Sequence, residues 1–133
     1  MTPTKSTEAV VLDASAMVDL LTGQSNANAI RDFLRHKAVH VPAHFDAEVL
    51  SALGRLCRAG HLHADEVSEL LKALRRAPFT RHQLHDLIEG AWARRDTHRL
   101  VDGLYVELAE RLRASLVTTD QRLAGSYQSA RLP

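Results

Sequence analysis

Short apolar runs that alternate with helix-like stretches constrain the fold of this 133-residue chain more than any other feature. Residues 10–12 read Val-Val-Leu, residues 116–119 read Leu-Val-Thr-Thr, and an aspartate follows each run. Such runs, without polar alternation, are typical of strands that are buried on both faces of a parallel sheet. Because parallel strands need helical crossovers, the chain is predicted to have a three-layer α/β fold. Helices would flank a central parallel sheet of four to five short strands.

Apolar spacing and helix-ending residues place the individual elements. Strands are expected at residues 10–12, 38–41 and 115–119, with a weak strand at 79–84. Helices are expected at about 14–21, 26–35, 44–58, 65–77, 85–94 and 101–112. In the last two helices, helical spacing predicts these inward-facing residues: Leu87, Ile88, Ala91 and Trp92, then Val101, Leu104, Leu108 and Leu112.

The composition narrows the class of protein. Hydrophobic residues make up 45% and charged residues 25% of the chain, which is ordinary for a single globular domain spanning residues 1–133. The formal net charge of +1 neither favours nor excludes a nucleic acid partner. Cys57 is the one cysteine, so no internal disulfide can form, and no run resembles a signal peptide or a membrane span. A soluble, cytoplasmic protein is expected.

Four acidic residues lie at positions where functional residues are expected in an α/β fold. Asp13 and Asp120 each follow an apolar strand, and ligands of parallel sheets bind at the carboxyl ends of the strands. Glu48 borders the apolar face of its helix, and Asp102 stands among apolar neighbours, where a carboxylate is costly unless its charge is offset. An alternative for Asp13, Asp102 and Asp120 is a purely structural role as helix N-caps.

A cluster of these carboxylates would need a cation. Carboxylates at close range do not all stay ionised unless a positive charge offsets their repulsion. Hard oxygen ligands favour Mg²⁺ or Mn²⁺, and Mg²⁺ commonly bridges a few carboxylates and a substrate phosphate. The acids therefore predict a metal-dependent hydrolase that acts on phosphodiester bonds.

Four segments resemble the motifs of PIN-domain nucleases, and specifically those of the VapC toxins. Their order and separation match that family from Val10 to Ala124, and their limits are residues 10–18, 42–50, 101–109 and 116–124. The resemblance implies that Asp13, Glu48, Asp102 and Asp120 form an acidic metal site, with the hydroxyl groups of Ser15 and Thr118 in supporting positions.

The resemblance also implies an activity and partners. The expected activity is that of an Mg²⁺-dependent endoribonuclease, with Mn²⁺ as a possible substitute, which leaves 5′-phosphate and 3′-hydroxyl ends and inhibits growth. The expected partners are RNA, a VapB-type antitoxin and a second copy of the chain in a homodimer. The helices at 45–57 and 67–74 could supply a groove for the antitoxin, although core packing is the alternative for their apolar residues.

Basic residues near the third and fourth motifs are candidates for contacts to RNA phosphates. A guanidinium can bind two phosphate oxygens at once, although a solvated surface is the alternative. The candidates are Arg94, Arg95, Arg99 and Arg122.

The chain departs from the family pattern in three places. Gly103 replaces the more usual alanine, and Thr97 and Arg99 stand where an asparagine and a small hydroxyl residue are expected. The final edge strand, at Ala130 to Leu132, must be short or absent.

Other chemistries fit the sequence less well. A zinc site built from Cys57, His61 and His63, or from His82 and His85, lacks a recognised four-ligand spacing. A Cys57 nucleophile is disfavoured because the thiol lies on an apolar helix face, and phosphotransfer through Asp13 lacks a Gly-rich phosphate loop. The main competing hypothesis is a catalytically inactive PIN-like module that binds RNA or protein, which the four acids argue against.

Overall fold

The computed structural model describes residues 7–127 and 130–131. Within these residues, five parallel strands form one sheet in the order β3-β2-β1-β4-β5. The strands are β1 (Ala9–Leu12), β2 (Ala38–Pro42), β3 (Thr80–His82), β4 (Ser115–Val117) and β5 (Ala130–Arg131). The helices are α1 (Ala14–Leu21), α2 (Ala27–Leu34), α3 (Phe45–Arg58), α4 (Ala64–Arg76), η1 (Leu84–Asp86), α5 (Ile88–Ala93), α6 (Leu100–Leu112) and α7 (Gln121–Ser126).

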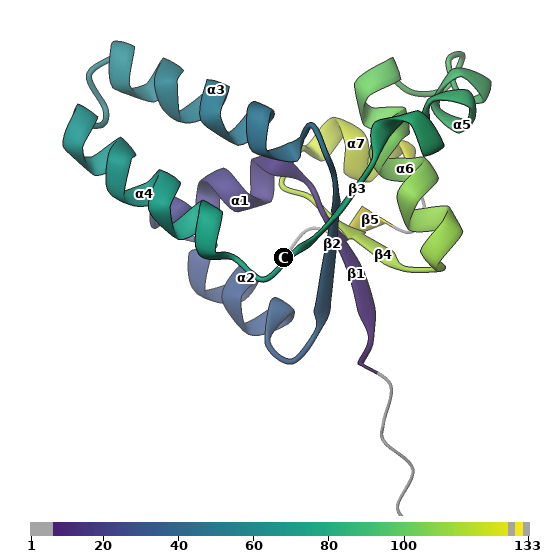
Figure 1. Ribbon diagram of the computed structural model, residues 1–133, viewed down its shortest axis with the longest axis horizontal. Coiled ribbons are helices and arrows are strands. Elements are labelled where there is room, and N and C mark those ends of the chain that lie inside the picture. The colour runs from purple at the N-terminus through teal and green to yellow at the C-terminus, as the bar shows by residue number, and fades with distance from the viewer. Residues whose placement is uncertain (1–6, 128–129, 132–133) are drawn as a thin grey trace, which may run out of the picture.

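The helices cover both faces of the sheet, which confirms the predicted three-layer α/β fold. Figure 1 shows α1 to α4 on one side of the strands and α5 and α6 on the other. The central strands β1 and β4 are almost wholly buried, because they pack against helices on both faces. Gly23 and Gly60 follow α1 and α3 with φ values of 69° and 83°, left-handed conformations that glycine adopts at little cost.

The core lies between the sheet and one face of each long helix. Its largest fully buried side chains include Tyr105, Phe45, Leu53 and Leu108. Phe45, Val49 and Leu53 form the buried face of α3, as the sequence predicts. These three side chains are enclosed in the core. For them the core-packing alternative is therefore confirmed, and the α3 face that they form is not an open groove.

Two predicted helices differ from the structure. The expected helix at 85–94 is a turn of 3-10 helix, η1, followed by the short α5, so Leu87 and Ala91 are buried but Ile88 and Trp92 are mainly exposed. In α6, Val101 is exposed, and Gly103, Tyr105, Val106 and Ala109 join Leu108 on the buried face.

The last two strands can be compared with their predicted limits. The predicted strand at 115–119 stops at Val117, because Thr118 and Thr119 turn toward α7. The short edge strand is present as β5, and Leu132 lies outside the described residues. None of the helices in the described part of the chain is long and apolar enough to cross a membrane.

Candidate active site

The site begins at the carboxyl ends of β1 and β4. These strands are adjacent and parallel with Leu12 opposite Val117, so Asp13 and Thr118 emerge side by side. The backbone N–H of Asp13 donates to the carbonyl of Val117 over 2.9 Å, which fastens the two strand ends together. The sequence prediction that Asp13 and Asp120 reach the same edge of the sheet is confirmed, because both line one pocket.

Asp13 is held by two hydroxyl groups. Ser15 Oγ and Thr118 Oγ1 each donate to Asp13 Oδ2 over 2.7 Å. The side chain is only 7% exposed, and burial raises its pKa, although the two hydroxyl donors partly oppose the rise. The charges of Glu48 and Asp102 also act to raise the pKa of Asp13. The predicted supporting residues, Ser15 and Thr118, therefore contact Asp13 directly.

The N-cap alternative holds for one acid of the three. Asp120 Oδ1 accepts hydrogen bonds from the backbone N–H groups of Arg122 and Leu123, which caps the start of α7. Asp13 precedes α1 but its side chain makes no cap hydrogen bond, and Asp102 lies inside the first turn of α6. Helix capping therefore does not explain why carboxylates stand at positions 13 and 102.

Glu48 enters the site from α3 and is held by a residue of α6. Tyr105 Oη donates to Glu48 Oε1 over 2.6 Å, and His44 Nε2 lies 3.2 Å from the same oxygen. Partial burial acts to raise the pKa of Glu48, but the contacts with His44 and Tyr105 outweigh burial and lower it. Burial and the nearby carboxylates raise the pKa of Tyr105, so its hydroxyl keeps its proton and serves as a donor.

Asp102 and Asp120 share a guanidinium. Arg122 Nη2 donates to Asp102 Oδ2 over 2.7 Å and to Asp120 Oδ2 over 3.0 Å. These contacts, with that to Asp102 the larger, raise the pKa of Arg122. Arg99 Nε lies 3.6 Å from the same oxygen of Asp102. A positive charge therefore already lies between two of the four acids.

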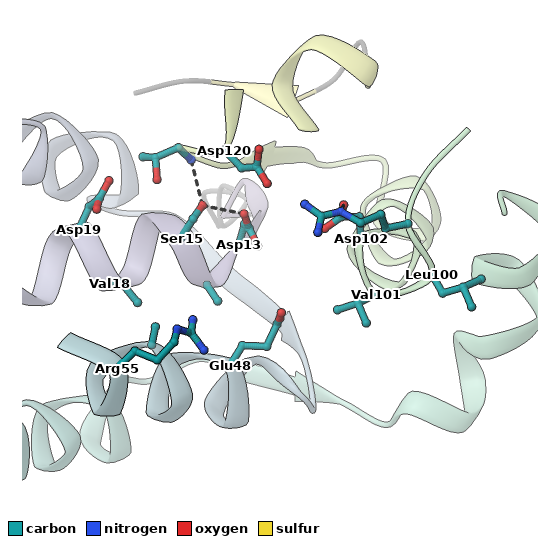
Figure 2. Close-up of a pocket in the computed structure, with 14 residues that line it drawn as sticks. Asp13, Ser15, Val18, Asp19, Glu48, Arg55, Leu100, Val101, Asp102 and Asp120 are labelled. Carbon is teal, nitrogen blue, oxygen red and sulfur yellow. Dashed lines mark hydrogen bonds and ion pairs between the residues drawn. The ribbon is translucent and has the colours of Figure 1, made fainter. Parts of the chain in front are cut away.

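A pocket of about 790 Å³ collects the four acids. Figure 2 shows Asp13, Glu48, Asp102 and Asp120 around it, contributed by the β1 end, α3, α6 and the β4–α7 turn. Asp19 and Arg55 extend the wall along α1 and α3, and Leu100 and Val101 form an apolar rim. An opening of this size, with oxygen ligands at its base, suits a phosphorylated substrate and a hard cation.

The chemistry of the acids fits Mg²⁺ or Mn²⁺, although they are not tightly clustered. Among the described residues, no three side chains of the His, Cys, Asp and Glu types form a group that could hold a metal ion by themselves. Mg²⁺ keeps several waters and usually takes only one or two protein carboxylates together with substrate phosphate. Carboxylates that surround a pocket can therefore serve such an ion, whereas a structural zinc site needs a closed set of ligands.

The four candidate arginines separate into two groups. Arg99 lies at the pocket and Arg122 bonds to two of its acids. Arg94 forms an ion pair with Glu107 and donates to the carbonyl of Gly90, outside the pocket. Arg95 lies over the ring of Trp92, with its guanidinium carbon 4.8 Å from the ring centre. The structure thus brings Arg99 and Arg122 to the acids and gives Arg94 and Arg95 other neighbours.

Sequence reasoning missed Tyr105 and His44 as neighbours of Glu48. The sequence does contain a signal for Tyr105. It lies three residues after Asp102 on an apolar helix, and a buried tyrosine hydroxyl needs a hydrogen-bond partner. The sequence does not identify that partner, because Glu48 lies 57 residues earlier in the chain. His82, considered for zinc, instead has its Nε2 2.8 Å from Nδ1 of His40.

Comparisons with known proteins identify similar sequences. A model of the PIN domain family matches residues 10–125. The chain is 57% identical over 129 residues to Ribonuclease VapC3 of Mycobacterium tuberculosis strain H37Rv, which covers 96% of this chain and 94% of that protein. It is 37% identical over 118 residues to Ribonuclease VapC12 of the same strain, and the match covers 89% of this chain and 92% of that protein.

Among solved structures, a toxin–antitoxin complex from Klebsiella pneumoniae contains a similar chain. The TM-score is 0.71 at 16% identity, with 93% of this chain and 97% of that chain covered. This likeness shows a shared fold.

Proposed function

The chain belongs to the PIN domain family, among the VapC ribonucleases, and from this premise we propose that it is a metal-dependent endoribonuclease and the toxin of a toxin–antitoxin pair. The observation that carries the proposal is the convergence of Asp13, Glu48, Asp102 and Asp120 on one pocket from four separate segments. Oxygen ligands around an open pocket support hydrolysis of a phosphodiester bond better than any chemistry based on a nucleophilic side chain.

In this proposal Asp13, Asp102 and Asp120 would hold one Mg²⁺ or Mn²⁺ directly or through water, and Glu48 would complete that site or help to hold a second ion. When bound, such an ion activates water for hydrolysis and offsets negative charge on the phosphate. Ser15 and Thr118 fix one oxygen of Asp13, and Tyr105 fixes one oxygen of Glu48. Arg99 is 71% exposed at the pocket and is available to a phosphate of the RNA. Attack by water on the phosphorus with the ribose 3′-oxygen as leaving group, which takes up a proton, leaves a 5′-phosphate and a 3′-hydroxyl end.

The proposed partners are RNA, an antitoxin of the VapB type and a second copy of the chain. The curated relatives are named as VapC ribonucleases, and the structure of similar fold from Klebsiella pneumoniae is a toxin–antitoxin complex, which supports the antitoxin proposal. The outer residues of α3 and α4, such as Leu50, remain candidates for the antitoxin groove. We place this single catalytic domain in the cytoplasm, where its RNA substrates are found.

The test is cleavage of total cellular RNA by the purified chain with Mg²⁺ or Mn²⁺, followed by sequencing of new 5′ ends. Discrete 5′-phosphate ends are expected, and chelator or Asp102→Asn should abolish them. A 2′,3′-cyclic phosphate would contradict hydrolysis by water, because it requires attack by the ribose 2′-hydroxyl. Metal-independent RNA binding without any cleavage would favour the inactive binding module instead.

A further inference from the structure

Tyr105 connects two walls of the pocket. It lies on α6, its hydroxyl donates to Glu48 on α3 over 2.6 Å, and the side chain is only 1% exposed. The His44 ring packs beside it, with ring centres 5.1 Å apart. A ring enclosed in this way has little freedom to rotate, so the position of its hydroxyl is set by the core and not by solvent.

Glu48 needs an external restraint to keep one orientation. Its side chain is 37% exposed and has several rotatable bonds, so a free glutamate at this position would sample many rotamers. The hydrogen bond from Tyr105 engages Oε1, which His44 Nε2 also approaches at 3.2 Å, and both contacts leave Oε2 for a ligand. The same pattern occurs at Asp13, where both hydroxyl donors bond to Oδ2.

We propose that Tyr105 is a positioning residue that orients the Glu48 carboxylate for binding of the divalent cation. This inference rests on the proposed metal-dependent function. Hydrogen-bond donors behind a carboxylate ligand hold it in its binding orientation, and their loss typically weakens metal affinity by about 10-fold or more. Tyr105 acts through Glu48 and does not itself touch the substrate.

The chain offers a matched control. Tyr127 Oη donates to Glu110 Oε1 over 2.7 Å, and neither residue lines the pocket. Tyr105→Phe and Tyr127→Phe therefore each remove one hydroxyl from a tyrosine–glutamate hydrogen bond, but only the first removes it at the pocket.

The experiment measures Mn²⁺ affinity by isothermal titration calorimetry without RNA, and then the Mn²⁺ concentration that gives half-maximal cleavage. Tyr105→Phe should weaken Mn²⁺ binding by about 10-fold and raise the half-maximal concentration in parallel. Tyr127→Phe should leave both values as in the wild type. Thermal melting in chelator checks that both variants fold.

A second pair of variants separates positioning from a general packing effect. If Tyr105 acts through Glu48, Tyr105→Phe should cause little further loss of Mn²⁺ affinity in a Glu48→Gln background. An undiminished loss in that background, or wild-type Mn²⁺ affinity for Tyr105→Phe alone, would overturn the inference and leave the proposed function standing. Absence of both Mn²⁺ binding and Mn²⁺-dependent RNA cleavage by the wild-type chain would overturn both.

Discussion

At the scale of single residues, Asp13 shows a conflict between stability and function. Its carboxyl is nearly buried, and burial raises its pKa above the ordinary value of 3.8. A carboxyl with a raised pKa binds its proton more tightly in the folded state than in the unfolded state. Its contribution to stability is therefore fully present below the unfolded pKa and is lost as the pH rises through the folded pKa. Above the folded-state pKa, the ionised Asp13 opposes folding unless a cation offsets its charge.

Asp13→Asn should therefore stabilise the metal-free chain at neutral pH while abolishing cleavage. The amide oxygen can still accept hydrogen bonds from Ser15 and Thr118, and the buried charge is gone. A rise in Tm of a few degrees at pH 7 in chelator is expected, and it should shrink as the pH falls toward 3.8. A Tm difference that stays constant with pH would mean that ionisation of Asp13 is not its cause.

Arg122 supplies the positive charge between Asp102 and Asp120. A divalent cation that uses these acids must compete with its guanidinium. Arg122→Ala is therefore expected to increase Mn²⁺ affinity severalfold, measured by calorimetry. Arg111→Ala, which removes a partner of Glu107 instead, is the control and should leave the affinity unchanged. Weaker Mn²⁺ binding by Arg122→Ala would show that the arginine orients the two acids instead of competing for them.

At the scale of elements, the contact between α5 and α6 explains features that their sequences alone leave open. A Cβ atom at Gly103 would lie 3.2 Å from the backbone of Ala91, so the close approach of the two helices accounts for a glycine at this position. Because α5 is so short, it buries only Ala91 and leaves Ile88 and Trp92 largely exposed. The helical spacing of apolar residues predicted that Ile88 and Trp92 are buried. A side chain is buried, however, only where another element packs against that part of its helix.

Glycine-to-alanine changes in two helices should have opposite effects on stability. Gly54 lies within α3, where an added Cβ has room, so Gly54→Ala should stabilise the chain by about 0.5–1 kcal/mol through helix propensity. At Gly90 in α5, a Cβ would overlap the side chain of Glu107, which pairs with Arg94. Gly90→Ala should therefore lower stability in urea titrations. A gain equal to that at Gly54 would mean that Glu107 moves aside at no cost.

At the scale of the whole molecule, the net charge of +1 does not predict whether the protein binds RNA, so the prediction depends on where individual arginines lie relative to the pocket. Arg99→Ala should weaken RNA binding by catalytically inactive Asp102→Asn protein and reduce the slope of log affinity against log salt by about 1. Arg94→Ala should leave that slope unchanged and lower Tm, because Arg94 is committed to Glu107. Equal salt slopes for the two variants would contradict the proposed phosphate contact of Arg99.

The sequence alone determined the α/β class, the order of most elements and the positions of the four acids. These properties follow from local patterns: apolar runs predict buried strands, helical spacing predicts helices, and each strand-end acid is adjacent to its strand. The sequence predicts a final edge strand that is short or absent, and the structure has it as the two-residue β5.

Only the tertiary structure decided which side chains support those acids. Tyr105 meets Glu48 because α6 and α3 converge on the pocket, and no local pattern links residues 57 positions apart. In the same way, Arg94 and Arg99 look equivalent in the sequence, but one pairs with Glu107 and the other lies at the pocket. Hydrogen bonds and ion pairs form between neighbours in space, so they depend on how elements pack and not on the propensities of each element alone.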